Sequence, residues 1–586
     1  MGAPLTGQFP FHQIPQNLRL PLFWAEVDPS RANSNEQTQR ALIIGQQLSD
    51  PTKASTVHSA VTSAGTTSPA STLTFATQPA GVQVGDYVFD TTTVNAITEG
   101  TTVTALGATI TLSAPTAANV VLGDTIVFVS CKPQLMQSAA QARALYGAGS
   151  MIVEMVNRYR QNDDFGELWT IGIPDDLAAV AATCTITVQG QATAQGVISL
   201  YVNGTLVPVV VTPTMTVTDT GAAIASAINA AIDLSSQNPV GVTAQASSGV
   251  VTATARHKGA IGNDNDVRVN YYGPGNGEVL PAGVTLIITP MASGATNPTA
   301  MFTAILATLG DRPYDFIAFP WIDTTSLNTI KTFLDDVTGR WSWLKQIYGH
   351  GFTAARGTVG SLVTLGTARN DQHVTIFGFN DSPSPSWHWS SALVGACATS
   401  IRADPGMPLH GMELIGLLAP PASSQFTTSD MSTLVFDGIS VSVVSPAGQV
   451  ITKLIITTYQ LNTSGKPDDS YLKVETMFLL TAILRYLHGR VSSKYARMKL
   501  AADGTPIPAN SNIVTPAIIR AEMIAAYITM EGFGWVQADR VFAQAVAVQI
   551  DPHNPNRVNI LWPGILINQL DVIALLAQFR LSPSQV

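Results

Sequence analysis

The sequence contains few charged residues for its length. Only 12% of its 586 residues are Asp, Glu, Lys or Arg, while 46% are hydrophobic; soluble domains usually carry about 25% charged residues. The mean hydropathy is positive, +0.22. Two kinds of protein have such a composition. One is a membrane protein, and the other is a subunit that buries much of its surface against copies of itself, because obligate interfaces are apolar and poor in charge.

Long hydrophobic runs are also absent. The longest stretch without a charged residue lies between Asp176 and Asp219, and Gln, Asn, Gly and many Thr interrupt it. A membrane-spanning helix needs about 20 mostly apolar residues, whereas the alternating pattern of this stretch predicts strands. We therefore expect no membrane insertion, and self-assembly is the explanation that remains for the composition.

Cysteine is scarce. Cys131, Cys184 and Cys397 are odd in number and far apart, which argues against a disulfide framework and a cysteine metal site. We expect reduced, buried cysteines in a protein made in the cytoplasm. We also expect no signal peptide, because the N-terminus lacks a basic start followed by an apolar core. The net charge of −9 argues against direct nucleic-acid binding over the whole surface.

Motifs for catalysis, cofactors and metals are missing as well. The segment Asn-Asp-Asn-Asp at 263–266 lacks the spacing and closing Glu of an EF-hand, so we expect a turn stabilised by its side chains. The glycine-rich 273–277 lacks the lysine of a P-loop. We predict no catalytic, cofactor or metal site. Asp, His and Ser residues of the types that form a catalytic triad occur in the predicted α/β domain, but none lies in a G-x-S-x-G motif. We interpret these triad-type residues as surface and turn residues: Asp315, His350, His373, Ser384 and Ser390.

The residues that are present predict an α/β and β multidomain protein with extended terminal arms. Five prolines exclude a helix in residues 1–30. Exposed apolar strands tend to pair with other chains, so we expect 1–30 to be an arm that pairs elsewhere; a disordered tail is the alternative. Its apolar residues share one side of a strand: Leu18, Leu20, Leu22 and Trp24.

An α/β domain is predicted from three separate pieces, 31–52, 131–180 and 293–430. Buried strands alternate with helical patterns in these pieces, which is typical of this fold class. Helical patterns are expected at 134–160, where Gly147 and Gly149 split the pattern into two helices, and at 326–343. The strands are expected at 41–45, 168–174, 315–320, 351–357 and 373–378.

A β-rich block interrupts this domain at 53–130. It is rich in Thr, Ala, Ser and Gly and poor in charge. Two similar phrases, 82–89 and 121–128, indicate matching edge strands. We expect an inserted β-domain on the surface.

A second β-rich domain is predicted at 181–292. The pair Asn203-Gly204 between two apolar runs is a strong hairpin signal. A helix is expected at 220–232, with Asp219 as its N-cap.

The last part of the chain predicts an α+β domain, 431–568, and then a C-terminal arm, 569–586. The domain is expected to open with a β-section at 438–459 and to contain long helices near 469–490 and 515–531. The run 570–579 is almost entirely apolar and fits a helix or a strand. Its apolar residues are further candidates for contacts between subunits: Val572, Leu575, Leu576 and Phe579.

One cluster of positive charge stands out in this charge-poor chain. Arg490, Lys494 and Arg497 share a helical face if the helix continues through Gly489. A solvated helix face is one interpretation. The other is a surface for an acidic partner, since screened surface contacts are weak and reversible. The cluster consists of Arg485, Arg490, Lys494, Arg497 and Lys499.

Several segments of the sequence resemble those of one known protein family. They lie at 14–28 (IPQNLRLPLFWAEVD), 255–264 (ARHKGAIGND), 457–460 with 467–472, 557–559 and 575–580. Together they resemble the Mu-like contractile phage tail sheath family, and the match extends along the chain apart from 53–130.

The resemblance implies a structural subunit and not an enzyme. Such subunits polymerise as stacked six-fold rings around a tail tube and contract to drive the tube through the host cell envelope. The central domain is implied to be similar in fold to subtilisin without being a protease. The C-terminal domain is implied to lie against the tube, and the arms to add strands to sheets of neighbouring subunits. The implied location is the virion tail, and the implied partners are the protein itself, the tail tube, baseplate and tail terminator proteins.

Two other classes fit parts of the sequence. The Thr-rich β-blocks fit a surface adhesin, and a subtilisin-like fold fits a hydrolase. An adhesin needs neither two apolar arms nor a basic helical domain, and a hydrolase needs an assembled nucleophile.

Overall fold

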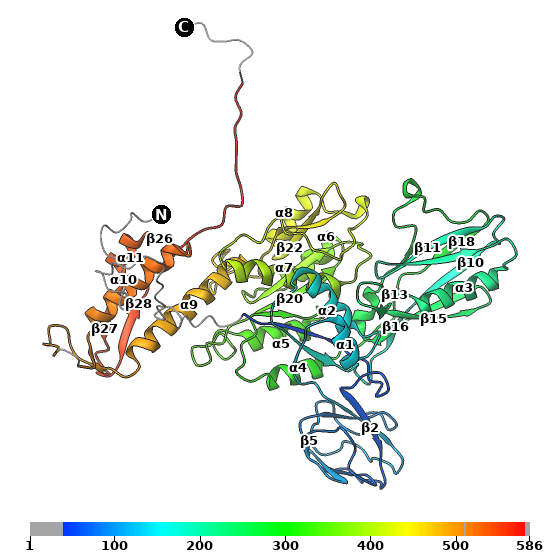
Figure 1. The fold of residues 1–586 in the computed structure, drawn as a ribbon, viewed down its shortest axis with the longest axis horizontal. Helices are drawn as coiled ribbons and strands as arrows, with labels where there is room; N and C mark the ends of the chain where they lie inside the picture. The colour runs from blue at the N-terminus through cyan, green and yellow to red at the C-terminus, as the bar shows by residue number, and fades with distance from the viewer. Residues whose placement is uncertain (1–38, 509–510, 580–586) are drawn as a thin grey trace, which may run out of the picture. The chain divides into compact units, whose positions relative to one another are not determined.

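A computed structural model describes residues 39–508 and 511–579 of the chain (Figure 1). The described residues form two compact units, Gln39–Thr481 with the segment from Ile567, and Ala482–Leu566. Within them, no helix has both the length and the apolar character needed to cross a membrane.

The larger unit is built on an eight-stranded sheet with the order β23-β22-β21-β20-β19-β1-β9-β8. The strands from β22 to β9 are parallel, and β23 and β8 pair antiparallel at the two edges. Strands such as β1 and β21 are buried along their whole length, which is why they are continuous apolar runs in the sequence. The strands are β1 (Ala41–Gln46), β8 (Gln134–Leu135), β9 (Leu168–Ile173), β19 (Phe316–Ala318), β20 (His350–Arg356), β21 (Val374–Phe379), β22 (Ile439–Val444) and β23 (Val450–Leu454).

Seven helices of this unit accompany the sheet. The most deeply buried, α7, packs against α2 and β20. Gly147 and Gly149, both with positive φ, separate α1 from α2 as predicted. The bounds are α1 (Ala139–Tyr146), α2 (Met151–Asn162), α4 (Thr299–Thr308), α5 (Thr324–Leu334), α6 (Val359–Thr367), α7 (Ser386–Ala403) and α8 (Thr428–Phe436).

The helix predicted at 326–343 is shorter in the structure, because α5 ends at Leu334. The carboxylate of Asp335 accepts hydrogen bonds from the backbone N–H groups of Val337 and Thr338, at 2.9 and 2.8 Å. This Asx turn replaces the next helical turn. The residues 335–349 are therefore a loop.

The block 53–130 forms two three-stranded sheets, β2-β7-β4 and β3-β6-β5. The prediction that 121–128 is an edge strand is wrong, because β7 lies between β2 and β4. Its side chains alternate between two cores: Ile126 and Phe128 face the core of the insertion, and Val127 and Val129 face that of the central sheet. The strands are β2 (Val57–Val61), β3 (Thr72–Thr74), β4 (Tyr87–Asp90), β5 (Val103–Ala105), β6 (Thr109–Leu112) and β7 (Thr125–Val129).

The second β-rich block has its own core between a four-stranded sheet, β15-β16-β10-β18, a three-stranded sheet, β12-β11-β17, and helix α3. Asn203 and Gly204 form the predicted hairpin turn between β11 and β12, with φ of 49° and 82°. The elements are β10 (Ala181–Gln189), β11 (Gly196–Val202), β12 (Thr205–Val211), α3 (Val217–Ala230), β13 (Ile232–Asp233), β14 (Asn238–Pro239), β15 (Val242–Ser247), β16 (Val250–Lys258), η2 (Ala260–Asp264), β17 (Val267–Val269), η3 (Pro274–Asn276) and β18 (Thr285–Ile288).

The predicted N-cap of α3 needs correction. Thr216 is the N-cap, and Asp219 is the third residue of the helix, whose carboxylate accepts a hydrogen bond from the N–H of Thr216 at 2.9 Å. The two residues form a capping box, in which each side chain binds the backbone of the other.

The described residues of the unit Ala482–Leu566 form only two-stranded sheets: β24-β25, β26-β29 and β27-β28. Its core contains the stacked rings of Tyr527 and Phe542, with centroids 3.9 Å apart, among buried side chains such as Met523 and Met530. Helix α9 begins in the larger unit and ends in this one. The elements are α9 (Val474–Tyr495), β24 (Lys499–Leu500), β25 (Ile513–Val514), α10 (Pro516–Gly532), β26 (Val536–Gln537), α11 (Asp539–Ala545), β27 (Ala547–Ile550), β28 (Val558–Leu561) and β29 (Ile565–Leu566).

The predicted boundary at residue 431 differs from the structure. Strands β22 and β23 belong to the central sheet, and the smaller unit begins at Ala482. The run 570–579, for which we predicted a helix or a strand, is neither.

Candidate assembly surfaces

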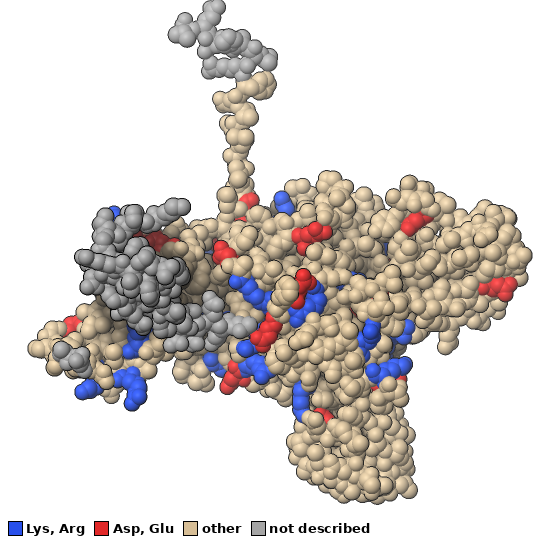
Figure 2. Space-filling model, in the orientation of Figure 1, with Lys and Arg blue, Asp and Glu red and all other residues tan. Residues whose placement is uncertain are grey.

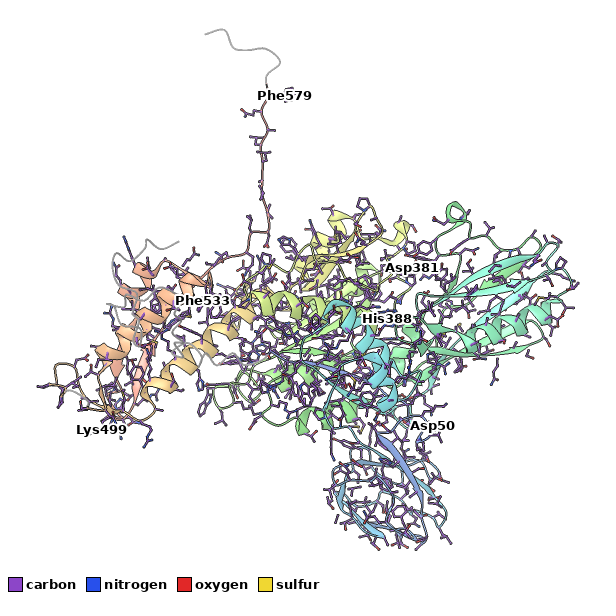
Figure 3. All side chains as sticks on the ribbon, viewed as in Figure 1. Asp50, Asp381, His388, Lys499, Phe533 and Phe579 are labelled. Atoms are coloured by element: carbon purple, nitrogen blue, oxygen red, sulfur yellow. The ribbon has the colours of Figure 1, made fainter. Side chains whose placement is uncertain are left out.

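The C-terminal segment 567–579 is extended and leaves its apolar side chains in solvent (Figure 3). The exposed fraction is 79% for Val572, 87% for Leu575, and 83% for both Leu576 and Phe579. Asp571 forms an ion pair with Lys473, so the start of the segment is attached to the larger unit. Exposure of so many adjacent apolar groups is unfavourable, and the segment is therefore a surface that lacks a partner within the described chain. The matching residues of the N-terminal arm, Leu18, Leu20, Leu22 and Trp24, lie outside the described residues.

Several strands in the described part of the smaller unit have an edge without a strand partner. Strands β27 and β28 form a hairpin of four residue pairs, from Ala547↔Leu561 to Ile550↔Val558. Neither strand pairs with a third strand among the described residues. A two-stranded sheet is marginally stable alone, and a free strand edge can receive a strand from another chain.

The basic cluster is partly neutralised inside the smaller unit. Helix α9 continues through Gly489, as the predicted shared face required. Glu522, only 12% exposed, accepts hydrogen bonds from both Arg490 and Lys494, the latter at 2.8 Å. Burial alone would raise the pKa of Glu522, but these hydrogen bonds hold its pKa below the ordinary value.

The remaining residues of the cluster lie elsewhere. Arg497 follows the last residue of α9, so it does not share the predicted helical face with Arg490 and Lys494. Arg497 and Lys499, which begins β24, are exposed, and Arg485 is half-buried on α9. Exposed positive charge therefore lies at and beyond the end of the helix.

The smaller unit differs in charge from the rest of the chain. Residues 482–566 contain eight Lys and Arg against five Asp and Glu, a net charge of +3 in a chain whose total is −9. The insertion is the opposite case: residues 54–130 contain no Lys or Arg. Three of its four acidic residues, Asp86, Asp90 and Asp124, are buried, and Glu99 is half-buried. The visible face of the insertion is almost free of charged atoms (Figure 2).

A buried polar network connects α2, α7 and the second β-rich block. The carboxylate of Glu154 accepts a hydrogen bond from Trp387 Nε1 at 2.7 Å and lies 3.0 Å from His388 Nε2. Arg158, on the same helix, pairs with Asp233 at 3.1 Å. Burial lowers the pKa of His388 below its ordinary value, so the ring is neutral near pH 7. The network explains Trp387 and His388 as interior residues.

The triad-type residues are buried, so our interpretation of them as surface and turn residues is wrong. The hydroxyl groups of the two serines bind the backbone: Ser384 Oγ accepts from Leu418 N at 3.0 Å, and Ser390 Oγ donates to Trp387 O at 3.2 Å. The histidines have other partners. His350 Nε2 is 2.8 Å from Thr375 Oγ1, and His373 Nε2 is 2.7 Å from Asp336 Oδ1. Asp315 accepts a hydrogen bond from Arg40 N at 3.0 Å.

The acidic segment 263–266 binds other side chains. Asp264 pairs with Arg356, and Asp266 pairs with Arg268 at 2.6 Å. Within the described parts of the chain, no group of three or more His, Cys, Asp or Glu is arranged to hold a metal ion. The three cysteines are free and buried, as predicted.

One exposed surface was missed in the sequence because it lay in a predicted helix. Trp343 and Leu344 are 78% and 74% exposed, at the tip of the loop 335–349. A turn-forming Asp-Asp pair at 335–336 and Gly339 were the available signals that the helix ends before them.

Comparison with known proteins points to one family. Residues 293–457 match the family described as the phage tail sheath protein central domain. The Mu-like prophage FluMu tail sheath protein of Haemophilus influenzae is 35% identical over 442 residues, which cover 75% of this chain and 88% of that protein.

Solved sheath proteins are also similar to the chain. The sheath tail protein of Desulfitobacterium hafniense has 12% identity and a TM-score of 0.38, with 75% of this chain and 93% of that chain covered. The sheath tail protein of Listeria innocua has 12% identity and a TM-score of 0.37, with coverage of 74% and 91%. Because these TM-scores are low, the family assignment depends on the sequence matches.

Proposed function

The chain belongs to the Mu-like phage tail sheath family, and on that premise we propose that it is the subunit of a contractile sheath. The subunits polymerise as stacked six-fold rings around a tail tube, and contraction drives the tube through the host cell envelope. The protein acts as a structural subunit, made in the host cytoplasm and incorporated into the virion tail, where it also meets the baseplate and tail terminator proteins.

The observation that carries this proposal is the exposed C-terminal segment. A segment of about 12 extended residues reaches up to about 40 Å, far enough to enter a neighbouring subunit. Its main chain has no sheet partner among the described residues, and its apolar side chains are exposed. Addition of the segment to an open strand edge of a neighbouring subunit would pair its main chain and bury its apolar side chains. The hairpin β27-β28 offers such an edge, and the N-terminal arm 1–30 is proposed to act in the same way.

A repeated donor-to-acceptor contact also determines the form of the assembly. When each subunit donates an arm to the next and receives another, the contact is heterologous and propagates into rings or helices. Extended links between subunits can persist while the compact domains move, which suits a sheath that changes length.

Removal of the C-terminal segment tests the proposal. A variant that ends at Asp571 keeps the ion pair with Lys473 and loses the exposed apolar residues beyond it, so we expect an unchanged melting temperature and the loss of tubes or rings in electron micrographs and sedimentation. The double substitution Leu575→Lys and Leu576→Lys should have the same effect, because charges cannot enter an apolar contact. Phe436→Lys is the matched control, since Phe436 is 81% exposed and isolated at the end of α8. Normal assembly of the truncated variant would contradict the proposal.

The tube contact is assigned to the smaller unit, with its net charge of +3 and its exposed Arg497 and Lys499. We expect the tube to present acidic groups that complement this positive charge. Exposed ion pairs across such a contact are weak and screened by salt, which permits sliding. Reversal of both charges, Arg497→Glu with Lys499→Glu, should block assembly on tubes while self-assembly persists. Normal extended tails from this variant would exclude the assignment.

A further inference from the structure

The loop 335–349 presents two large apolar side chains side by side. Trp343 and Leu344 are 78% and 74% exposed, and Val337 on the same loop is 74% exposed. Exposed tryptophan is uncommon because its burial is strongly favourable. Isolated exposed apolar side chains need no explanation, but adjacent ones on a single loop do.

The loop is held in one shape by internal contacts. Arg340, only 2% exposed, donates to the backbone oxygen atoms of Gly310 and Arg312. Trp341 stacks on His373, with ring centroids 4.5 Å apart, and its Nε1 donates to Gly349 O at 2.8 Å. The two tryptophans thus differ in environment. Trp341 packs on His373 and fixes the loop to the rest of the larger unit, whereas Trp343 is exposed to solvent.

A fixed frame matters for binding. A contact that is already in its bound shape avoids the loss of entropy that ordering a loop requires. Tryptophan is also the residue type most enriched among those that dominate interface energies. The loop combines both properties.

The charges of the loop identify the chemistry of its partner. Asp335 binds the loop's own backbone, Asp336 binds His373 and Gln372, and Arg340 is buried. Asp336 nevertheless stays 52% exposed, and the fourth charged residue of the loop is the exposed Lys345, so the loop presents one charge of each sign. The loop therefore offers little to a highly charged partner, and it matches an apolar surface that is poor in charge.

We propose that the Trp343–Leu344 surface is a rigid contact with a second copy of this chain. A chain with only 12% charged residues supplies the matching surface, and the inference rests on the proposed function, which places copies next to one another. The extended arms keep subunits connected, while this loop sets how neighbouring larger units pack.

A double substitution tests the contact. Trp343→Ser with Leu344→Ser changes side chains that are mostly in solvent, so the melting temperature of the isolated subunit should stay unchanged. We expect the protein concentration needed for assembly to rise about tenfold or more, as for a dominant interface residue. Phe165→Ser is the matched control, because Phe165 is 97% exposed without an adjacent exposed apolar side chain of similar size, and it should assemble like the original protein. Assembly of the double variant at the original concentration would overturn the inference.

Tryptophan quenching identifies the partner. The fluorescence that acrylamide quenches in the original protein but not in Trp343→Phe reports on Trp343 alone among the nine tryptophans. Protection of this component in sheath-only polymers supports contact with a second copy. Protection only when the tube is present, or its absence in both assemblies, overturns it. If the original protein forms no polymers at all, the proposed function fails as well, whereas polymers with an unprotected Trp343 contradict only this inference.

Discussion

The central sheet and the unit Ala482–Leu566 are built in opposite ways. In the central sheet, β1 and β21 are buried along their whole length, and the edge strand β23 is bonded to 411–414 through Leu414 N to Val450 O at 2.9 Å. Among its described residues, the smaller unit has only pairs of strands. The first region thus completes most of its own hydrogen bonding and burial, whereas the described strands of the second keep edges without a strand partner.

The two regions should therefore differ in how far their stability depends on neighbouring subunits. A completed region can move as a rigid body, and an incomplete one gains stability when neighbours bind it. Four experiments on the isolated subunit can break or sharpen this comparison.

The largest effect is expected from Phe542→Ala. Phe542 is fully buried and stacks on Tyr527, and such a truncation costs about 4 kcal/mol. Because the small core has few other members, amide exchange should accelerate throughout α10 while amides in β1 and β21 keep their protection. Phe533→Ala is the control in the same unit, where Phe533 is 54% exposed. Loss of protection in the central sheet as well would show that the two regions are not independent.

The next effect concerns the polar network of the larger unit. Glu154→Ala leaves Trp387 Nε1 and His388 Nε2 without their buried acceptor, which should lower the free energy of unfolding by about 3 kcal/mol. The urea midpoint of the larger unit measures the loss. Glu154→Gln retains an acceptor oxygen and should lose less. Equal midpoints for the alanine variant and the original protein would mean that the network does not stabilise the fold.

The stability of the two regions should depend on pH through different groups. Burial lowers the pKa of His388, and burial with the nearby His373 holds the pKa of His350 well below its ordinary value. At these two histidines the unfolded chain therefore binds more protons below about pH 6.5, and their contribution to the stability of the larger unit falls there by at most about 1.4 kcal/mol per pH unit for each histidine. Glu99 acts in the opposite direction, because burial raises its pKa to about 7.

Glu522 behaves differently because its pKa is lowered. Its contribution is present above the pKa of the unfolded chain, about 4.3, and is lost as the pH falls through the folded value. Amide exchange at pH 7.5, 6 and 5 measures the pH slope of each unit, and the histidine contribution is the part that a histidine variant removes from the larger unit. His388→Gln should reduce its loss of protection at low pH, and the exposed His410→Gln should not. Equal slopes for His388→Gln and the original protein would contradict the assignment.

The smallest effect is expected from Lys494→Ala. Lys494 is 47% exposed in its pair with Glu522, and such pairs contribute about 0.5 kcal/mol. Arg490→Ala should cost more, because Arg490 is 24% exposed and also contacts Tyr486. Chemical unfolding of the smaller unit measures both, and a larger loss for Lys494 would reverse the order that burial predicts.

Local patterns were enough to predict many elements. The apolar run of β1, the two glycines between α1 and α2, and the Asn203-Gly204 turn each determine local structure through side-chain burial or backbone freedom. The alternation in 121–128 predicted a strand but not its place in the sheet. That place depends on two cores which residues distant in the sequence complete.

Polar residues were the hardest to place. The segment Trp387-His388-Trp389 gave no sign that Glu154, more than 200 residues earlier, accepts hydrogen bonds from it. The triad-type residues were expected at the surface because they are polar, yet long-range partners such as Thr375 and Arg40 satisfy them in the interior. The length of α5 also depended on a single carboxylate, which could have stayed in a continuing helix.

The sequence by itself determined the low charge, the apolar C-terminal segment, the insertion without Lys or Arg at 54–130, and the family, because these follow from composition and from motifs along the chain. Only the tertiary structure decided that the apolar segment lacks a sheet partner among the described residues, that Glu522 neutralises part of the basic cluster, and that Trp343 is exposed on a rigid loop. The reason is physical. Composition determines how many apolar, charged and hydrogen-bonding groups must be buried or paired, and only the fold determines which of them are buried or paired within the same chain.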